Sequence, residues 1–203
     1  MDRDEGPEEE ALVRRIENQV KNTPPRCICG FRCAPAELPE PWDDNFTTVW
    51  QLACSCQGKA GSILGYSLAD YNREFHGPEA LISPIAFECS GCCRVTEILD
   101  TGEHGYNPEV GRVEGYPAGT HFRGTGPRKR FRCPTCLQER FGVTVGFVYW
   151  GFDLFLDKEE MIAGGIWRES HFDHPEDFFN VFLSFARCAG CGALARPTKF
   201  GKL

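Results

Sequence analysis

Three stretches of the chain alternate between apolar and polar positions with a period of two residues. Their apolar positions are rich in aromatic and β-branched side chains, which favour strands. One stretch leads into Cys54, one follows Cys136, and one leads into Cys188. We therefore predict strands whose apolar positions are Phe46, Thr48, Trp50 and Leu52; Phe141, Val143, Val145, Phe147 and Tyr149; and Phe179, Val181, Leu183 and Phe185.

The pattern near the N-terminus has a helical period instead. Apolar residues recur every four positions over residues 8–20, and acidic residues occupy the first turn, where they suit the helix dipole. Thr23, Pro24 and Pro25 are expected to end this helix. A second, short helix is predicted near residues 158–162. The predicted fold class is therefore mainly β, with one N-terminal α-helix.

The 12 cysteines change this picture, because most of them are closely paired. A tetrahedral Zn²⁺ ion takes four sulfur ligands at about 2.3 Å, and a short gap lets one turn present two of them. In a reducing compartment, such pairs indicate metal rather than disulfides. Ten cysteines form five pairs: Cys27/Cys29, Cys54/Cys56, Cys89/Cys92, Cys133/Cys136 and Cys188/Cys191.

The two pairs nearest the C-terminus resemble the knuckles of a zinc ribbon, in which two turns from separate hairpins hold one ion. Cys133-Pro-Thr-Cys136 has a proline after its first cysteine, and Cys188-Ala-Gly-Cys191 is followed by a glycine. Both residues favour a tight turn. The resemblance, limited to the knuckle motifs, implies a structural metal and a surface held for partners. A redox dithiol would need a βαβ context, and disulfides are the third interpretation.

The pairs also indicate an internal repeat. Residues 53–71 (ACSCQGKAGSILGYSLADY) align loosely with residues 132–154, and LISPIAFECSGC aligns with FFNVFLSFARCAGC. Each half then has a pair, a polar turn, an apolar strand, an insertion, a second apolar strand and a second pair. We predict tandem zinc-ribbon-like hairpin units with one Zn²⁺ each. The ligands would be Cys54, Cys56, Cys89 and Cys92 in one unit and Cys133, Cys136, Cys188 and Cys191 in the other.

The remaining cysteines leave two alternatives open. Cys27, Cys29 and Cys33 could join Cys93 in a third site, because 12 cysteines divide into three groups of four. Alternatively, Cys27 and Cys29 could share a metal with the pair at residues 54–56. That scheme leaves the pair at residues 89–92 without an evident partner. The expected cofactor is Zn²⁺, with two ions, or three if the third site forms.

The order of these features predicts four regions along the chain. They are an acidic segment and helix (1–22), a cysteine-rich β unit (23–101), a Gly-rich connector (102–126) and a zinc-ribbon-like β unit (127–203). The N-terminus is acidic where a secretory signal would be basic and then apolar, and no stretch reaches the roughly 20 apolar residues of a membrane span. We therefore expect a cytoplasmic protein without membrane association.

Two polar clusters are candidates for function. The first is basic, with interleaved aromatic residues that could stack on bases beside phosphate contacts; its members are Arg123, Arg128, Lys129, Arg130 and Arg132. The second, at residues 171–177, places two histidines and three acidic residues together, as in a metal or acid–base site. It also fits the capping of a short turn begun by Pro175, which is the favoured interpretation.

Three functions follow from these features. The favoured one is a zinc-stabilised interaction protein of the adaptor or inhibitor type, without catalytic activity, that binds a protein partner. A formal charge of −7 suits a basic partner and argues against a protein built wholly around polyanion binding. The alternatives are nucleic-acid binding through the basic cluster and a metal-dependent enzyme that uses residues 171–177.

Overall fold

A computed structural model describes residues 6–42, 46–74, 76, 78–106, 123–152, 155–165 and 167–198. The helices in this part of the chain are α1 (Pro7–Asn22), α2 (Leu68–Tyr71) and α4 (Lys158–Ala163), with short 3₁₀ turns η1 (Arg26–Ile28), η3 (Glu169–His171) and η4 (Pro175–Asp177). The predicted N-terminal helix and the short helix near residue 158 are both confirmed. No helix among the described residues is long and apolar enough to cross a membrane.

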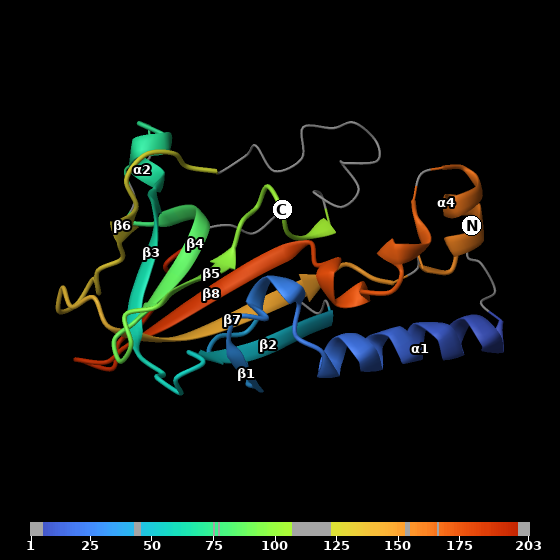
Figure 1. Cartoon of the computed structure of the whole chain (residues 1–203), viewed down its shortest axis with the longest axis horizontal. Coiled ribbons are helices and arrows are strands. Elements are labelled where there is room, and N and C mark those ends of the chain that lie inside the picture. The colour runs from blue at the N-terminus through green and yellow to red at the C-terminus, as the bar shows by residue number, and fades with distance from the viewer. Residues whose placement is uncertain are drawn as a thin grey trace.

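In the described part of the chain, nine strands form one antiparallel sheet, which curls on itself (Figure 1). Its backbone pairs run in the order β1-β2-β7-β3-β4-β5, with β8 on β7, β9 on β8 and β6 on β3. This confirms a mainly β fold with one N-terminal helix. The strands are β1 (Arg32–Pro35), β2 (Phe46–Ala53), β3 (Gly61–Ser67), β4 (Leu81–Cys89), β5 (Val95–Leu99), β6 (Lys129–Arg130), β7 (Phe141–Tyr149), β8 (Val181–Cys188) and β9 (Leu194–Ala195).

The two predicted repeats exchange strands. Each consists of a strand, a cysteine turn and a hairpin: β2 then β3–β4 in the first, and β6 then β7–β8 in the second. However, β2 pairs with β7 of the second repeat, while β6 pairs with β3 of the first. The registers correspond, because Gly61 lies opposite Cys89 in one hairpin and Phe141 opposite Cys188 in the other. Gly61 and Phe141 also pair with each other, so the two repeats meet at the start of their hairpins.

The main core fills the inside of the curled sheet and includes residues from both repeats. Side chains from β4, β7 and β8 meet there, among them Phe87, Phe147 and Phe182, together with Ile16 and Val20 of α1. The strand β8 is buried on both faces, which its alternating pattern did not predict. Its outer face packs against the segment before β2 in a second cluster of Val148, Val181, Leu183 and Phe185, with Leu38, Trp42 and Leu194 beside them.

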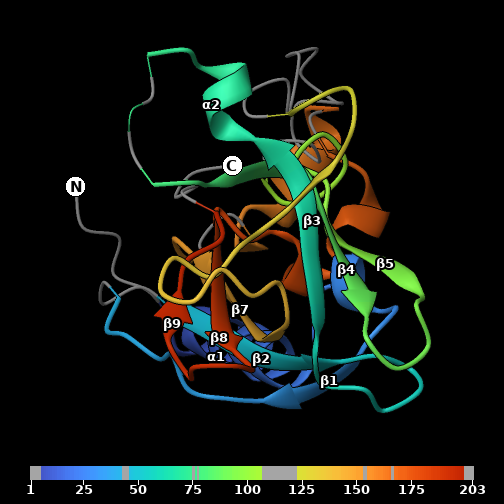
Figure 2. The same ribbon diagram turned by 90° about the vertical axis from the view of Figure 1, so that its left-hand side faces the viewer.

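The four cysteine turns lie toward one end of the molecule, away from α1 and α4 (Figure 1). Figure 2 faces that end and shows β3, β4 and β5 standing beside the β2, β7 and β8 strands. Each turn joins or follows a strand of the sheet, so the backbone of the sheet sets the position of every cysteine pair from residue 54 onward. Most of the predicted connector, residues 107–122, lies outside the described residues.

Candidate metal centres

Each of the four cysteine pairs from residue 54 onward lies in a turn, and all four turns have the same backbone hydrogen bonds. In each turn the residue after the second cysteine donates its N–H to the carbonyl of the first cysteine. These bonds run from Gln57 to Cys54 (2.7 Å), Cys93 to Cys89 (2.9 Å), Leu137 to Cys133 (2.9 Å) and Gly192 to Cys188 (3.0 Å). The first cysteine also donates its own N–H to the carbonyl of the residue that follows this donor. The accepting carbonyls are those of Gly58, Arg94, Gln138 and Ala193. The turn at residues 54–57 forms the same two hydrogen bonds but is one residue shorter than the other three.

Every turn ends in the left-handed region of backbone conformation. The residue after the second cysteine has a φ of 73° at Gln57, 59° at Cys93, 62° at Leu137 and 74° at Gly192. Glycine adopts this conformation without strain, whereas residues with a Cβ do so rarely. The turn geometry that the sequence suggests for residues 188–192 is therefore common to all four pairs, even where no glycine is present.

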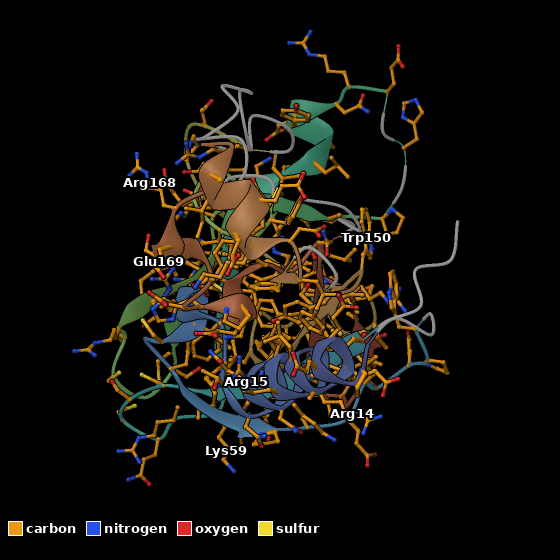
Figure 3. All side chains as sticks on the ribbon, turned by 90° about the vertical axis from the view of Figure 1, so that its right-hand side faces the viewer. Arg14, Arg15, Lys59, Trp150, Arg168 and Glu169 are labelled. Carbon is orange, nitrogen blue, oxygen red and sulfur yellow. The ribbon has the colours of Figure 1, made fainter. Side chains whose placement is uncertain are left out.

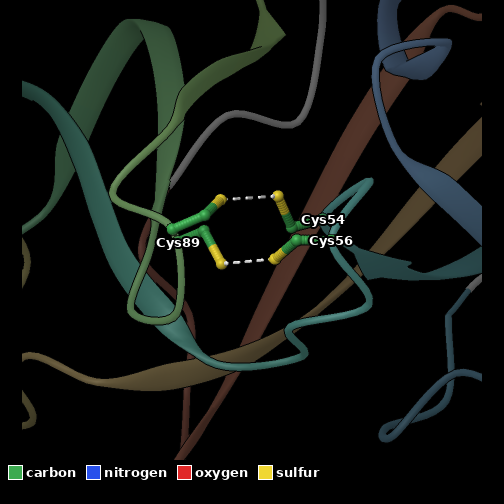
Figure 4. Close-up of side chains that lie close together, drawn as sticks. Cys54, Cys56 and Cys89 are labelled. Atoms are coloured by element: carbon green, nitrogen blue, oxygen red, sulfur yellow. Dashed lines mark hydrogen bonds between the residues drawn. The ribbon is translucent and has the colours of Figure 1, made fainter.

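The first four-cysteine group joins the turn after β2 to the turn after β4. The Sγ atoms of Cys54 and Cys92 lie 3.5 Å apart, and those of Cys56 and Cys89 also lie 3.5 Å apart (Figure 4). All four sulfur atoms lie within 4.8 Å of one another. Cys54 and Cys89 are buried, whereas Cys56 and Cys92 are exposed. We call this group the N-terminal site.

The second group joins the turn before β7 to the turn after β8. Here Cys133 Sγ lies 3.6 Å from Cys191 Sγ, and Cys136 Sγ lies 3.5 Å from Cys188 Sγ. The pairing is crosswise, as in the N-terminal site: the first cysteine of one turn faces the second cysteine of the other. Again the four sulfur atoms lie within 4.8 Å of one another. We call this group the C-terminal site.

These distances fit zinc better than disulfides. Four sulfur atoms at about 2.3 Å from a central ion form a tetrahedron with edges of about 3.8 Å. The measured distances of 3.5 and 3.6 Å are close to this edge, whereas a disulfide would require about 2.05 Å. Four thiolates leave no open position on the ion, which is typical of structural rather than catalytic zinc. The two groups therefore fit two structural Zn²⁺ ions.

Backbone N–H groups prepare these sulfur atoms for a metal. The N–H of Cys56 lowers the pKa of the Cys54 thiol to about 6. For Cys133, burial raises the pKa, but the N–H groups of Cys136 and Thr135, together with the thiols of Cys191 and Cys136, bring the pKa to about 6. In each site one thiol has a raised pKa instead, so each site holds thiols of contrasting acidity.

The second cysteines of two turns retain their protons more strongly. At Cys92 the N–H of Arg94 lowers the pKa, but the neighbouring thiols of Cys56 and Cys54 raise it to about 12 overall. Cys136 behaves in the same way, because the thiols of Cys191 and Cys188 outweigh the N–H of Gln138 and raise its pKa to about 12. A metal ion that binds these groups must displace their protons, so metal binding releases protons.

The four remaining cysteines all lie within the described residues, yet they form no third group of this kind. Cys93 is the left-handed last residue of its turn and is exposed. The Cys33 thiol lies 3.6 Å from the carbonyl of Ile28. Burial, and then the nearby Asp177 carboxylate, raise the pKa of Cys27 well above its usual value. The predicted third site with Cys27 and Cys29 is therefore not assembled, and neither is the alternative that joins that pair to residues 54–56.

The basic cluster that suggested nucleic-acid binding is paired with acidic residues throughout. Ion pairs join Arg123 to Asp100 (2.7 Å), Arg128 to Glu97 (3.6 Å), Lys129 to Asp70 (2.5 Å), Arg130 to Glu88, and Arg132 to Glu139 (3.1 Å). Each positive charge thus has a negative charge beside it. This arrangement weakens the local positive potential on which phosphate binding depends.

The histidine and acid cluster at residues 171–177 supports the fold. Glu176 is buried and accepts hydrogen bonds from Gln19 of α1 (3.2 Å) and from His174 Nδ1 (2.9 Å). Tyr149 donates to the Glu176 carbonyl at 2.6 Å. Asp177 pairs with the side chain of Arg26 and accepts its backbone N–H at 2.7 Å. The favoured capping interpretation missed this role, because nothing in the pattern places α1 beside these residues.

Sequence reasoning also missed Gly58, which follows the turn at residues 54–57. A Cβ atom at this position would lie 2.7 Å from Cys89 Sγ and 3.3 Å from Cys56 Sγ. The N-terminal site therefore has room for its sulfur atoms only because residue 58 has no side chain. The signal was present in the sequence, as a glycine two residues after a cysteine pair.

Comparisons with protein-family models, with characterised proteins and with solved structures gave no match. The class of protein is therefore defined by its fold and sites: a mainly β, cysteine-rich protein with two four-cysteine groups that fit zinc and resemble zinc-ribbon knuckles.

Proposed function

We propose that this protein is a zinc-stabilised interaction protein, in which two structural Zn²⁺ ions fix a β-rich surface for a protein partner. The observation that carries the proposal is the pair of closed four-cysteine groups, each built from two turns of one sheet. A closed site holds structure and leaves no position for substrate. The protein acts as an adaptor or inhibitor rather than as an enzyme, and it works in a reducing compartment such as the cytoplasm.

The surface of the described residues supports a role in binding. Four large apolar side chains are exposed, of which Trp150 (54%) and Tyr71 (48%) are aromatic. Aromatic residues of this kind contribute strongly to protein–protein interfaces. Trp150 follows β7 and lies on the opposite side of the molecule from Arg168 and Glu169 (Figure 3). Separate substitutions of the two aromatic residues test which of them contacts the partner.

The metal is tested first, by elemental analysis of protein purified without added zinc. We expect two zinc ions per chain, with all eight ligand cysteines protected from thiol reagents. Absence of zinc, together with oxidised pairs, would refute the structural basis of the proposal.

The partner is then tested by capture from the native host, followed by reconstitution. The zinc-loaded chain, a Trp150→Ser variant and a Tyr71→Ser variant are immobilised in parallel, and each captured protein is purified and titrated by calorimetry. We expect a partner that binds with defined stoichiometry and loses at least tenfold in affinity for one of the two variants. A chain that binds no purified protein, or that turns over a substrate, contradicts the proposal.

A further inference from the structure

An apolar pocket of about 720 Å³ lies on the outer face of β8, beside the turn that begins the C-terminal site. Leu183 and Phe185 of β8 line it, together with Trp42. Its other walls include Pro134 and Leu137 of the cysteine turn. Pockets of about 300–1,000 Å³ with mostly apolar walls and a few polar groups are typical of small-molecule sites. Neither the zinc sites nor the proposed partner surface accounts for this pocket.

Leu137 stands out among the lining residues. It is 70% exposed, more than any other large apolar residue in the described part of the chain. It also has a φ of 62°, a conformation that a bulky residue rarely adopts. At the corresponding place in the other C-terminal turn the chain has Gly192, which meets the same requirement without strain. Leucine is thus not favoured by the backbone conformation at residue 137, and its side chain does not pack in the core. The side chain can therefore contact a ligand in the pocket.

The charges at the pocket favour a negative ligand. Its lining includes the guanidinium groups of Arg132 and Arg196 and the carboxylate of Glu79. The Arg196 guanidinium lies over the Phe185 ring, 5.3 Å from its centre. A cation thus sits directly above the apolar floor of the pocket.

Both arginines already have acidic neighbours, but the pairs are exposed. Arg132 contacts Glu139 at 3.1 Å, and Arg196 contacts Glu40. Exposed ion pairs contribute little to stability, so an anion that also buries an apolar body in the pocket can compete with Glu139 and Glu40, whereas an anion held by charge alone would not. A ligand that buries its apolar part beside the arginines would make the stronger, partly desolvated contact.

We propose that this pocket binds a small amphiphilic anion, in which a carboxylate or sulfonate group is attached to an aromatic or branched aliphatic body. The apolar body lies against Leu183, Phe185 and the side chain of Leu137. The anionic group lies between Arg132 and Arg196. Because Cys133 and Pro134 form part of the wall, an intact C-terminal zinc site is needed for the pocket to exist.

The test uses two fluorescent probes on the zinc-loaded full chain. Anilinonaphthalene sulfonate carries the anionic group, and phenylnaphthylamine has the same aromatic body without the charge. We expect one sulfonate probe per chain with a micromolar Kd, and weaker binding of the uncharged probe. Arg196→Gln should weaken the sulfonate about tenfold and leave the uncharged probe unchanged, whereas Arg196→Lys should retain most of the affinity.

Leu137→Asn separates binding from folding. Asparagine tolerates the left-handed conformation better than leucine, so the variant should melt no lower than the wild type while binding both probes about tenfold more weakly. The matched control is Gln57→Asn, at the corresponding position of the N-terminal site, which should leave probe binding unchanged.

Equal probe binding by the wild type, Leu137→Asn and Arg196→Gln would overturn the proposal. It would also be overturned if the zinc-loaded protein sediments as a dimer that Leu137→Asn dissociates, because a second copy would then occupy the pocket.

Discussion

The two zinc sites are built by the same rules but differ in how tightly their surroundings hold them. Each has crosswise pairs of cysteines and two left-handed turn ends, and the hairpins of the two repeats have corresponding registers. The C-terminal site has two full-length turns, and its Cys136 is half-buried. The N-terminal site has one shortened turn, two exposed ligands and a glycine in contact with its sulfur atoms. The ligands of the N-terminal site are therefore less protected from solvent than those of the C-terminal site, although the two sites have the same arrangement.

Because β2 and β6 are exchanged between the repeats, the stability of each zinc site matters for the whole fold. The turn of the N-terminal site that carries Cys54 follows β2, whose backbone partner is β7 of the other repeat. Likewise, Cys133 follows β6, whose partner is β3. The ligands of each zinc site come from one repeat, but one turn of each site follows a strand that pairs with the other repeat, and one core includes residues of both. Loss of either ion should affect the entire sheet.

Removal of one ligand should give the largest effect and tests this coupling. Cys89→Ser and Cys188→Ser replace corresponding buried cysteines at the ends of β4 and β8. A structural zinc site contributes on the order of 10 kcal/mol to folding, so we expect either variant to lose at least one zinc ion and most of its stability. Calorimetry should show one shared transition at a much lower Tm. Two separate transitions, one of them at the wild-type Tm, would contradict the coupling.

The sequence predicted the parts of this arrangement that depend on local pattern. The helix at residues 7–22, the strands around residues 46–53 and 141–149, and the grouping of the eight cysteines all follow from period and spacing. The two repeats are recognisable for the same reason. Each prediction depends on residues within a few positions of one another, or on four cysteines that can bind one metal ion.

The long-range arrangement could not be predicted in this way. The strand exchange depends on which strand pairs with which, and the partners β2 with β7 and β6 with β3 lie far apart in the sequence. The third metal site was predicted from the number of cysteines alone, whereas the structure places Cys27 beside Asp177 and leaves Cys93 exposed as the end of a turn. Ion pairs across 30 or more residues, such as Lys129 with Asp70, leave no local signal either.

A second prediction ranks the two sites by their loss of metal. Under a limiting amount of chelator, the N-terminal site should release zinc first, because two of its ligands are exposed and its short turn is the least regular. A thiol reagent followed by mass spectrometry should then label Cys54 and Cys56 several-fold faster than Cys133 and Cys136. Cys29 and Cys93, which are exposed and outside both sites, serve as the fast reference. Faster labelling of the C-terminal site would reverse the ranking.

A third prediction concerns Gly58, where an added Cβ would meet the sulfur atoms of the N-terminal site. In Gly58→Ala the new Cβ would lie 2.7 Å from Cys89 Sγ, an atom that a bound zinc ion prevents from moving away. We expect a loss of about 1–3 kcal/mol, typical of overpacking, and weaker zinc retention at that site. Chemical denaturation and a chelator titration measure the two effects. Gly91→Ala is the matched control, because its Cβ would lie 3.8 Å from the same sulfur atom, and it should be nearly neutral.

The smallest effect is expected from the basic cluster that leads into the C-terminal site. The acidic partners Asp70, Glu88 and Glu97 come from the other repeat, so these ion pairs connect the two repeats across the surface. Exposed pairs contribute at most about 1 kcal/mol each. The triple variant Arg128→Ala, Lys129→Ala, Arg130→Ala should therefore lose on the order of 1–2 kcal/mol and keep both zinc ions.

The same triple variant decides whether the cluster has another use. If the positive charges serve mainly these ion pairs, the wild type should show no affinity for single-stranded DNA or RNA at low salt by fluorescence anisotropy, and the variant should not differ. Binding by the wild type that falls with added salt and disappears in the variant would show that nucleic-acid phosphates outcompete the acidic partners. The nucleic-acid alternative would then replace protein binding as the proposed function.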